Sequence, residues 1–458
     1  MTIPPAVPPA PLGPMSPPYR LVTVTIVALV SIVAFEELAV GTAMPVVARE
    51  LDAVRSYGLA FSSMLTAQLV AIVVAGLWTS RAGPLPALFL GQVLLAAGSA
   101  AAGLATSFAV LVGGRVVAGL GGGLLVIALY VVIGRAYPVA SRPKVFGWTS
   151  GAWVLPSLVG PPLAGWLATA VSWRWVFLVV VPPVGLAAAL GWSRQAQLLG
   201  DATVPPAARG GQRGAILWCL LVAVGAGALQ WGTDQAGTLG GGATVVGAAA
   251  VLLGFPRLVP IGTLRMARGL PSVVLARFLL SATFNGSWVY LPLMLVGSRG
   301  LSPTVAGAMA TVGSIGWFGG SYLQAREAFT PRPTELVRLG GLCVATSLVV
   351  LGLAARLDWP LAAVALGAAV GGIGMGFGIA TTSVLALALA PVQDHGRTSA
   401  GLQLADVLGA LLGIGAAGGV FAARHDGVRS DLPTFTLIWL VLAAVALLVL
   451  PAGQRSKT

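Results

Sequence analysis

Long apolar runs separated by short polar stretches repeat along the whole chain. A helix needs about 20 apolar residues to cross the hydrocarbon core of a bilayer, and most of these runs reach that length. The pattern therefore predicts an all-α polytopic membrane protein. We place its fourteen spans at residues 21–44, 58–79, 86–106, 108–134, 144–170, 175–193, 214–233, 241–261, 272–296, 302–324, 336–355, 360–390, 397–422 and 433–451.

Composition indicates the same class. The chain has 458 residues, of which 57% are hydrophobic and 9% charged, whereas soluble globular proteins carry about 25% charged residues. The net charge of +13 comes from basic residues scattered singly between apolar runs, which does not suggest nucleic-acid binding. The two cysteines and two histidines have no metal-ligand spacing, so we expect no metal site.

Basic residues also suggest how the chain is threaded. With the N-terminus inside, most of the 26 Lys and Arg residues fall in cytoplasmic loops, as the positive-inside rule requires. We therefore expect a multi-pass protein of the inner (plasma) membrane with both termini cytoplasmic. Omitting a hairpin at 214–261 would leave every other loop on the same side, so the charge rule leaves twelve and fourteen spans both open.

Polar interruptions divide the chain into six parts. The proline-rich start lacks the basic and apolar regions of a secretory signal, and the longest polar interruption follows the sixth span. The predicted parts are a disordered cytoplasmic tail (1–20), a six-helix bundle (21–193), a cytoplasmic linker (194–213), an extra transmembrane hairpin (214–261), a second six-helix bundle (262–451) and a cytoplasmic tail (452–458).

One stretch, GAWVLPSLVGPPLAGWLATAVSWRWVFLVVVPPVG at 151–185, is rich in glycine and proline inside apolar sequence. Proline bends a helix and glycine lets another helix approach closely. Gly151, Gly160, Pro161 and Gly165 resemble the fifth-helix antiporter motif of the major facilitator superfamily, G-x(8)-G-P-x-x-G-G, with Ala164 in place of one Gly. The run WRWVF at 173–177 resembles the sixth-helix entry of its fourteen-span drug:proton antiporters.

This resemblance implies a fold and a mechanism. It implies the major-facilitator fold, with two six-helix bundles, an inserted two-helix hairpin and alternating access to a site between the bundles. The glycine and proline face of residues 151–165 would then pack against the other bundle and close the cytoplasmic leak. In the loop after the second span, Arg81 and Gly83 match the superfamily gating motif, whereas Ser80 replaces its Asp.

Three carboxylates lie inside predicted spans: Glu36, Glu37 and Asp406. A charged carboxylate at a helix centre costs roughly 2.5–3.5 kcal/mol on the insertion scale, so such residues are functional candidates. Glu36 falls on the acidic position of a first-helix motif of the family, although Leu38 and Gly41 depart from its polar positions. Each acid is a candidate for proton coupling. The alternatives are a hydrogen bond to a neighbouring helix for the glutamates, and a structural pair with an Arg for Asp406.

Arg115 lies in a glycine-rich run that resembles the family's fourth-helix motif. Arg115, Gly119 and Gly121 match it, and Ala118 replaces its Gln. The resemblance links Arg115 to proton coupling. The alternative is a structural Arg that donates to helix-end carbonyl groups.

Uncharged polar and aromatic side chains inside spans are candidates for lining a cavity. The alternative for each is a contact between helices or a place in the aromatic belt of the interface. Together they suggest an apolar, aromatic cavity that suits amphipathic molecules. The candidates are Gln68, Gln92, Tyr130, Trp148, Gln230, Asn285, Trp288, Tyr290, Trp317 and Gln403.

We therefore expect a monomeric secondary transporter that exports lipophilic small molecules in exchange for protons, uses the proton gradient and no cofactor, and contacts only protons, substrate and lipid. Three alternatives remain. The same fold could export an endogenous lipid or metabolite. An integral membrane enzyme would need a nucleophile–base pair, a metal cluster or a phosphate loop, and we identify none of these in the sequence. A non-transporting sensor lacks support from any soluble signalling domain.

Overall fold

The structure is a computed structural model that describes residues 13–138, 141–189, 212–234, 237–326, 332–391, 395–427 and 430–456. These residues form helices and connecting turns, with no strand among them, so the predicted all-helical fold is confirmed. Residues 1–12 of the predicted tail and 194–211 of the predicted linker lie outside the described residues. The first helix begins at Pro17, inside the predicted N-terminal tail (1–20), and the last helix ends at Gln454, inside the predicted C-terminal tail (452–458).

The helices follow the predicted runs. The N-terminal half contains α1 (Pro17–Glu50), α2 (Leu59–Ala82), α3 (Pro84–Gly103), α4 (Phe108–Ala136), α5 (Arg142–Gly151), α6 (Val154–Leu167) and α7 (Arg174–Leu178). A hairpin of α9 (Gln212–Asp234) and α10 (Thr238–Leu258) follows. The C-terminal half contains α11 (Leu270–Trp288), α12 (Tyr290–Leu293), α13 (Pro303–Gln324), α14 (Pro333–Arg356), α15 (Leu361–Leu389), α16 (His395–Arg424), α17 (Leu432–Ala446) and α18 (Val449–Gln454).

Within the described parts of the chain, 11 helices are long and apolar enough to cross a membrane. Two shorter apolar helices, Arg174–Ala189 and Leu217–Thr233, coincide with further predicted spans, and α13 coincides with another. Every predicted span therefore meets a helix. The total of fourteen crossings is compatible with this arrangement and stays a prediction.

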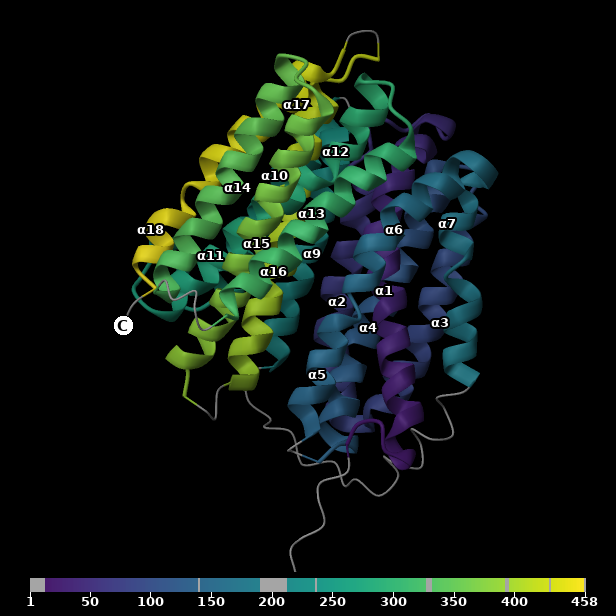
Figure 1. Cartoon of the computed structure of the whole chain (residues 1–458), viewed down its shortest axis with the longest axis vertical. Coiled ribbons are helices and arrows are strands. Elements are labelled where there is room, and N and C mark those ends of the chain that lie inside the picture. The colour runs from purple at the N-terminus through teal and green to yellow at the C-terminus, as the bar shows by residue number, and fades with distance from the viewer. Residues whose placement is uncertain are drawn as a thin grey trace, which may run out of the picture.

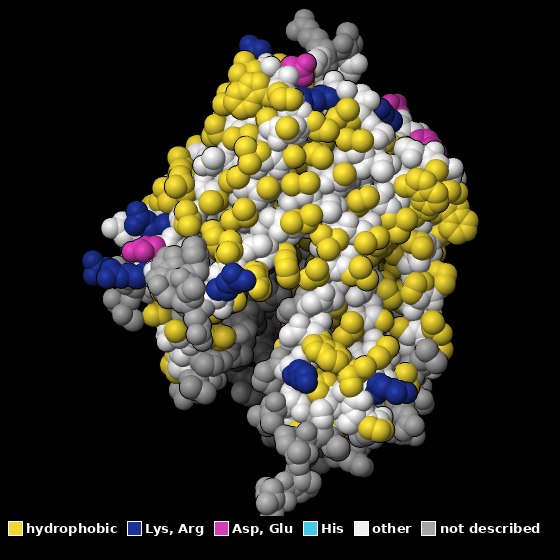
Figure 2. Space-filling model, in the orientation of Figure 1, with side chains coloured by type: hydrophobic (Ala, Val, Ile, Leu, Met, Phe, Trp, Pro, Cys, Tyr) yellow, Lys and Arg dark blue, Asp and Glu magenta, His cyan; other side chains and the backbone are white. Residues whose placement is uncertain are grey.

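The two halves stand side by side as helix bundles (Figure 1). Helix α1 begins at the end of the molecule that is lowest in this view, which we call the lower end, and runs to the opposite, upper end. Figure 2 shows a hollow between the halves that opens at the lower end. The largest buried apolar cluster includes residues of both halves, among them Tyr57, Phe61, Phe284 and Tyr290.

Proline interrupts the backbone hydrogen bonding of the helix that carries the glycine- and proline-rich stretch. The chain turns at Ala152 and Trp153, between α5 and α6. Pro156 has no N–H to donate to the carbonyl four residues earlier, so a continuous helix would lose a bond there. Further along, a π-helical turn at Ala168–Ser172 leads into α7. Helix α6 packs on α13 of the other half and on α1 of its own half, whereas α5 contacts α1 and α4 of its own half.

Candidate functional site

A buried ion pair joins the first and fourth helices of the N-terminal half. Arg115 on α4 donates from Nη1 to Oε1 of Glu36 on α1 at 2.9 Å, and the two side chains are 3% and 0% exposed. Arg115 also donates from Nε to the carbonyl of Ala60 on α2 at 3.1 Å. The other oxygen of Glu36, Oε2, is buried with no hydrogen-bond partner among the described residues. The pair therefore holds three helices together and leaves one acceptor unused.

The adjacent carboxylate has a different environment. Neighbouring residues on a helix point about 100° apart, and Glu37 accordingly turns toward α2, where Gln68 donates from Nε2 to its Oε1 at 3.0 Å. Glu37 is partly exposed, whereas Gln68 is buried. Among the described residues, the hydrogen-bond partner of this carboxylate is an uncharged amide, so no paired cation cancels its negative charge.

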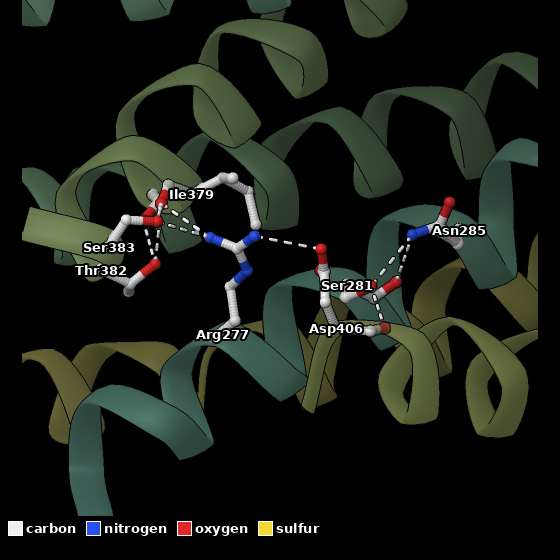
Figure 3. Close-up of polar contacts among 8 residues, drawn as sticks. Arg277, Ser281, Asn285, Ile379, Thr382, Ser383 and Asp406 are labelled. Atoms are coloured by element: carbon white, nitrogen blue, oxygen red, sulfur yellow. Dashed lines mark hydrogen bonds and ion pairs between the residues drawn. The ribbon is translucent and has the colours of Figure 1, made fainter. Parts of the chain in front are cut away.

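A second ion pair lies in the C-terminal half (Figure 3). Arg277 on α11 donates to Oδ2 of Asp406 on α16 at 3.1 Å, with side chains 7% and 30% exposed. Arg277 also donates to the carbonyl of Ile379 at 2.8 Å and to the hydroxyl of Ser383 at 3.1 Å, both on α15. Asp406 therefore has the Arg partner that we considered as the structural alternative.

Short polar contacts extend this network along α11. Ser281 donates to the backbone carbonyl of Asp406 at 2.7 Å, and Asn285 donates to the hydroxyl of Ser281 at 3.1 Å. Figure 3 shows Arg277, Ser281 and Asn285 in succession along the helix. The α11–α16 contact is thus fixed by both charged and neutral groups.

Charged groups of both halves act on Glu37. Glu37 and Asp406 are both partly exposed, and Glu37 lies within electrostatic range of Glu36 and Arg115 in its own half and of Asp406 in the other half. Glu36 and Asp406 each have a paired Arg. Among the described side chains at this level, Glu37 therefore contributes the negative charge that no paired Arg cancels.

The two halves meet closely near the upper end. The Cα of Gly165 on α6 lies so near α13 that a Cβ there would be 2.5 Å from the carbonyl oxygen of Pro303, and one on Gly307 would be 2.4 Å from that of Pro161. Gly160 instead packs on Phe35 of its own half, and Gly151 is exposed with open space around it. The predicted close approach is present, but it lies at the end opposite the N-terminus, whereas the motif led us to expect it on the N-terminal side.

Hydrogen bonds among the described residues also cross between the halves, at the upper end and further down between α6 and α13. Tyr57 donates to the carbonyl of Val289 at 3.1 Å, and Arg49 to that of Val296 at 3.0 Å. Thr311 donates to the carbonyl of Leu158 at 3.0 Å. Each acceptor is a main-chain oxygen, so these bonds depend on how the helices are placed. They break if the upper ends separate.

The other candidate residues differ widely in their burial. Trp288 is half-buried and stacks on Phe284 with ring centroids 4.9 Å apart. Tyr290 is fully buried in the upper contact, because its ring lies between those of Tyr57 and Phe421. The remainder are buried (Gln92, Gln230), half-buried (Trp148, Asn285, Trp317) or exposed (Arg81, Tyr130, Gln403). Gly83 ends α2 with φ 77°, a conformation that favours glycine.

The family model for the Major Facilitator Superfamily matches residues 26–366, most of the chain. The chain belongs to the Major Facilitator Superfamily. It is therefore a multi-pass membrane protein of a transporter family.

Superfamily members among curated proteins include drug exporters. The chain is 29% identical over 162 residues to the multidrug efflux pump SdrM of Staphylococcus aureus, covering 35% of this chain and 36% of that protein. It is 28% identical over 164 residues to the multidrug transporter protein MdtP of Bacillus subtilis, covering 36% and 30%. It is 32% identical over 175 residues to the vacuolar basic amino acid transporter 5 of Saccharomyces cerevisiae, covering 38% and 30%. The aligned region spans about a third of these relatives.

Solved superfamily structures share the fold over nearly the whole chain. A crystal structure of a peptide transporter with bound alafosfalin superposes with a TM-score of 0.70 at 15% identity, covering 97% of this chain and 98% of that one. A D-xylose–proton symporter superposes with a TM-score of 0.62 at 16% identity, covering 96% and 100%. The major-facilitator fold is thereby confirmed.

The site of this superfamily member contains a residue that the candidate set omitted. Arg277 pairs with Asp406 and bonds two groups of α15. A signal was present in the sequence, because a lone basic residue within an apolar run is costly unless it is paired. Its partner could not be read from the pattern, since the two residues are 129 positions apart.

Proposed function

We propose that this transporter exports amphipathic, cationic small molecules in exchange for protons across the plasma membrane. Both termini are cytoplasmic in this proposal, so the lower end faces the cytoplasm and the structure represents an inward-facing state. The hollow at the lower end (Figure 2) and the close contact of α6 with α13 at the other end support that assignment.

The observation that carries the proposal is the environment of Glu37. Its side chain is partly exposed and accepts a hydrogen bond from the amide of Gln68, and it lies within electrostatic range of Glu36, Arg115 and Asp406. Buried charge is costly unless compensated. A proton or an organic cation can each supply the compensation, but the two compete for one carboxylate. Such competition is what couples export of a cation to entry of a proton.

The paired acids have separate roles in this scheme. Glu36 is the second candidate for proton uptake, because its Oε2 is a buried acceptor without a partner. A proton there would weaken the pair with Arg115 and so loosen the contact of α1 with α4 and α2. Asp406 holds Arg277 and contributes its charge to the site from the opposite half. The gradient of protons is the energy source, and no cofactor enters the scheme.

Alternating access then follows from the contacts between the halves. In the outward-facing state the hydrogen bonds of Tyr57, Arg49 and Thr311 to the other half would be broken, and α6 would part from α13. A net hydrogen bond contributes about 0.5–1.5 kcal/mol, so three of them are a barrier that substrate and proton binding can overcome. The two bundles would rock about the level of Glu37.

Proton release tests the coupling directly. Purified protein in lightly buffered detergent is mixed with tetraphenylphosphonium, and released protons are followed with a pH indicator dye. We expect wild type and Glu50→Gln to release protons and Glu37→Gln to release none, because Glu50 pairs with Arg174 at the surface. Binding of the probe without proton release by wild type would overturn the exchange mechanism.

A cationic amino acid is the second candidate cargo. The relative named as a vacuolar basic amino acid transporter is 32% identical over the aligned region, and one uncompensated carboxylate suits a cationic side chain equally well. The same dye experiment with lysine and arginine separates the two. Release by lysine but not by tetraphenylphosphonium would assign an endogenous cargo to the site at Glu37.

A further inference from the structure

The extra hairpin does not stand apart from the two bundles. Helix α9 has one buried face, made of Cys219, Val222, Ala223, Ala226 and Gln230. Counted from Cys219, they stand at positions i, i+3, i+4, i+7 and i+11, which lie on one side of a helix. That face is apolar except for Gln230, and it contacts both halves of the transporter.

On one flank, α9 packs on α2 of the N-terminal half. The Sγ of Cys219 lies 3.7 Å from the carbonyl oxygen of Leu69. On the other flank, α9 packs on α16 of the C-terminal half. A Cβ on Gly415 would lie 2.8 Å from the amide nitrogen of Gln230, and one on Gly419 would lie 3.4 Å from Thr233.

Below the upper end, α9 occupies the space between α2 and α16. These two helices meet directly at their upper ends, where a Cβ on Gly58 would lie 3.4 Å from the Cα of Gly418. Further down, one buried apolar cluster joins residues of α2, α9, α10, α11, α15 and α16, including Leu69, Val222 and Leu408. The side of the molecule formed by α2 and α16 is therefore closed to lipid by α9.

On the opposite side, formed by α5 and α13, no helix among the described residues takes the place that α9 has between α2 and α16. Contact between α6 and α13 involves Gly165 with Pro303 and extends down to Leu158 with Thr311. Below that level Gly147 and Gly151 of α5 are exposed, and no described atom of another element lies within 4 Å of the Cβ position of either. The hollow is visible from this face, next to α5 (Figures 1 and 2).

We propose that the α9–α10 hairpin closes one of the two sides on which the halves could open to the bilayer, and that amphipathic substrates enter from the membrane through the other, between α5 and the lower part of α13. The proposal rests on the proposed export function for the nature of the substrate. That α9 closes the side formed by α2 and α16 follows from its packing on both helices and does not depend on the substrate. With the hairpin closing one side, substrates from the membrane would enter the transporter from the other side only.

Lipid contact can be mapped on the unmodified protein. The transporter is reconstituted into vesicles of phosphatidylcholine that carries a photoreactive diazirine in its acyl chain, irradiated, digested and analysed by mass spectrometry. We expect adducts on α10, whose Leu239 and Leu252 are 81% and 73% exposed, and on residues 146–151 of α5. We expect none on residues 59–73 of α2 or 404–415 of α16, which contain no exposed residue. Adducts on those segments at the level of α10, or none on α5, would overturn the proposal.

A plug tests the entry route. Gly147→Trp places an indole in the opening between α5 and α13, and Gly242→Trp places the same group on α10, where space is also open. In proteoliposomes we expect Gly147→Trp to slow tetraphenylphosphonium export about tenfold, which corresponds to about 1.4 kcal/mol, and Gly242→Trp to leave it unchanged.

The controls separate the two proposals. Gly151→Trp, at a second open position of α5, serves as an independent plug should Gly147→Trp not fold. Export by both α5 variants at the wild-type rate would refute entry between α5 and α13. If wild type itself moves neither tetraphenylphosphonium nor lysine, the proposed function fails, whereas the adduct pattern still decides whether α9 closes the α2 and α16 side.

Discussion

Replacing Arg115 by leucine removes the cation that faces a fully buried carboxylate. Glu36 is 0% exposed and its Oε1 accepts a hydrogen bond from Arg115 at 2.9 Å, while Oε2 has no partner among the described residues. Breaking a buried ion pair by deleting one partner costs about 3–5 kcal/mol, because an uncompensated charge stays behind. We therefore expect Arg115→Leu to be among the most destabilising single changes in the N-terminal half.

Two matched variants isolate the cause. Arg277→Leu removes the other paired Arg, but its carboxylate partner is 30% exposed, so solvent can reach the remaining charge and the loss should be smaller. The double variant Glu36→Leu/Arg115→Leu removes both charges together. Replacing a whole buried pair by apolar groups is often neutral or stabilising, so it should recover most of the stability.

The measurement is thermal unfolding in one detergent of wild type, Arg115→Leu, Arg277→Leu, the double variant and Glu36→Leu, read as loss of the monodisperse peak in size-exclusion chromatography after heating. A double-mutant cycle on Glu36 and Arg115, with Glu36→Leu as the fourth corner, then gives the coupling energy of the pair. Equal losses for Arg115→Leu and Arg277→Leu, or no recovery in the double variant, would refute the reasoning from burial.

Three further changes address the contacts between and around the halves. Gly307→Val adds a side chain at a position where a Cβ would lie only 2.4 Å from the Pro161 carbonyl oxygen. It should separate α6 from α13 and increase the rate at which a water-soluble maleimide labels Thr311→Cys. The control Gly319→Val, at a position with open space, should leave that rate unchanged. Tyr57→Phe removes the hydrogen bond to the Val289 carbonyl. It should shift the equilibrium between the closed and open upper end toward the open state by about 0.5–1.5 kcal/mol, read from the same labelling rate. An unchanged rate would mean that this bond does not hold the upper contact. Glu50→Gln breaks its ion pair with Arg174, in which the two side chains are 47% and 35% exposed, and should change the free energy of unfolding by less than about 1 kcal/mol. A loss as large as that of Arg115→Leu would contradict the argument that solvent weakens this pair.

The sequence by itself determined the spans and the residues that are exceptional within them. Runs of apolar residues can satisfy their backbone only as helices in a bilayer, so hydropathy alone located the helices. The cost of intramembrane charge likewise marked Glu36, Glu37, Asp406 and Arg115, because a few acids in a long apolar chain are easily sorted. The glycines and prolines of 151–165 predicted a close helix contact, and Gly165 and Pro161 take part in it.

Only the tertiary structure decided what each of these residues faces. Glu36 and Glu37 are adjacent in sequence, yet one is buried against Arg115 and the other is bonded to Gln68, because a turn of about 100° directs them to different helices. The pairing of Arg277 with Asp406 and the position of α9 between α2 and α16 are likewise invisible to local pattern. Hydropathy fixes how deep a residue lies in the membrane, but which helix lies beside it depends on how side chains of distant segments pack together, and that is settled only when the whole bundle assembles.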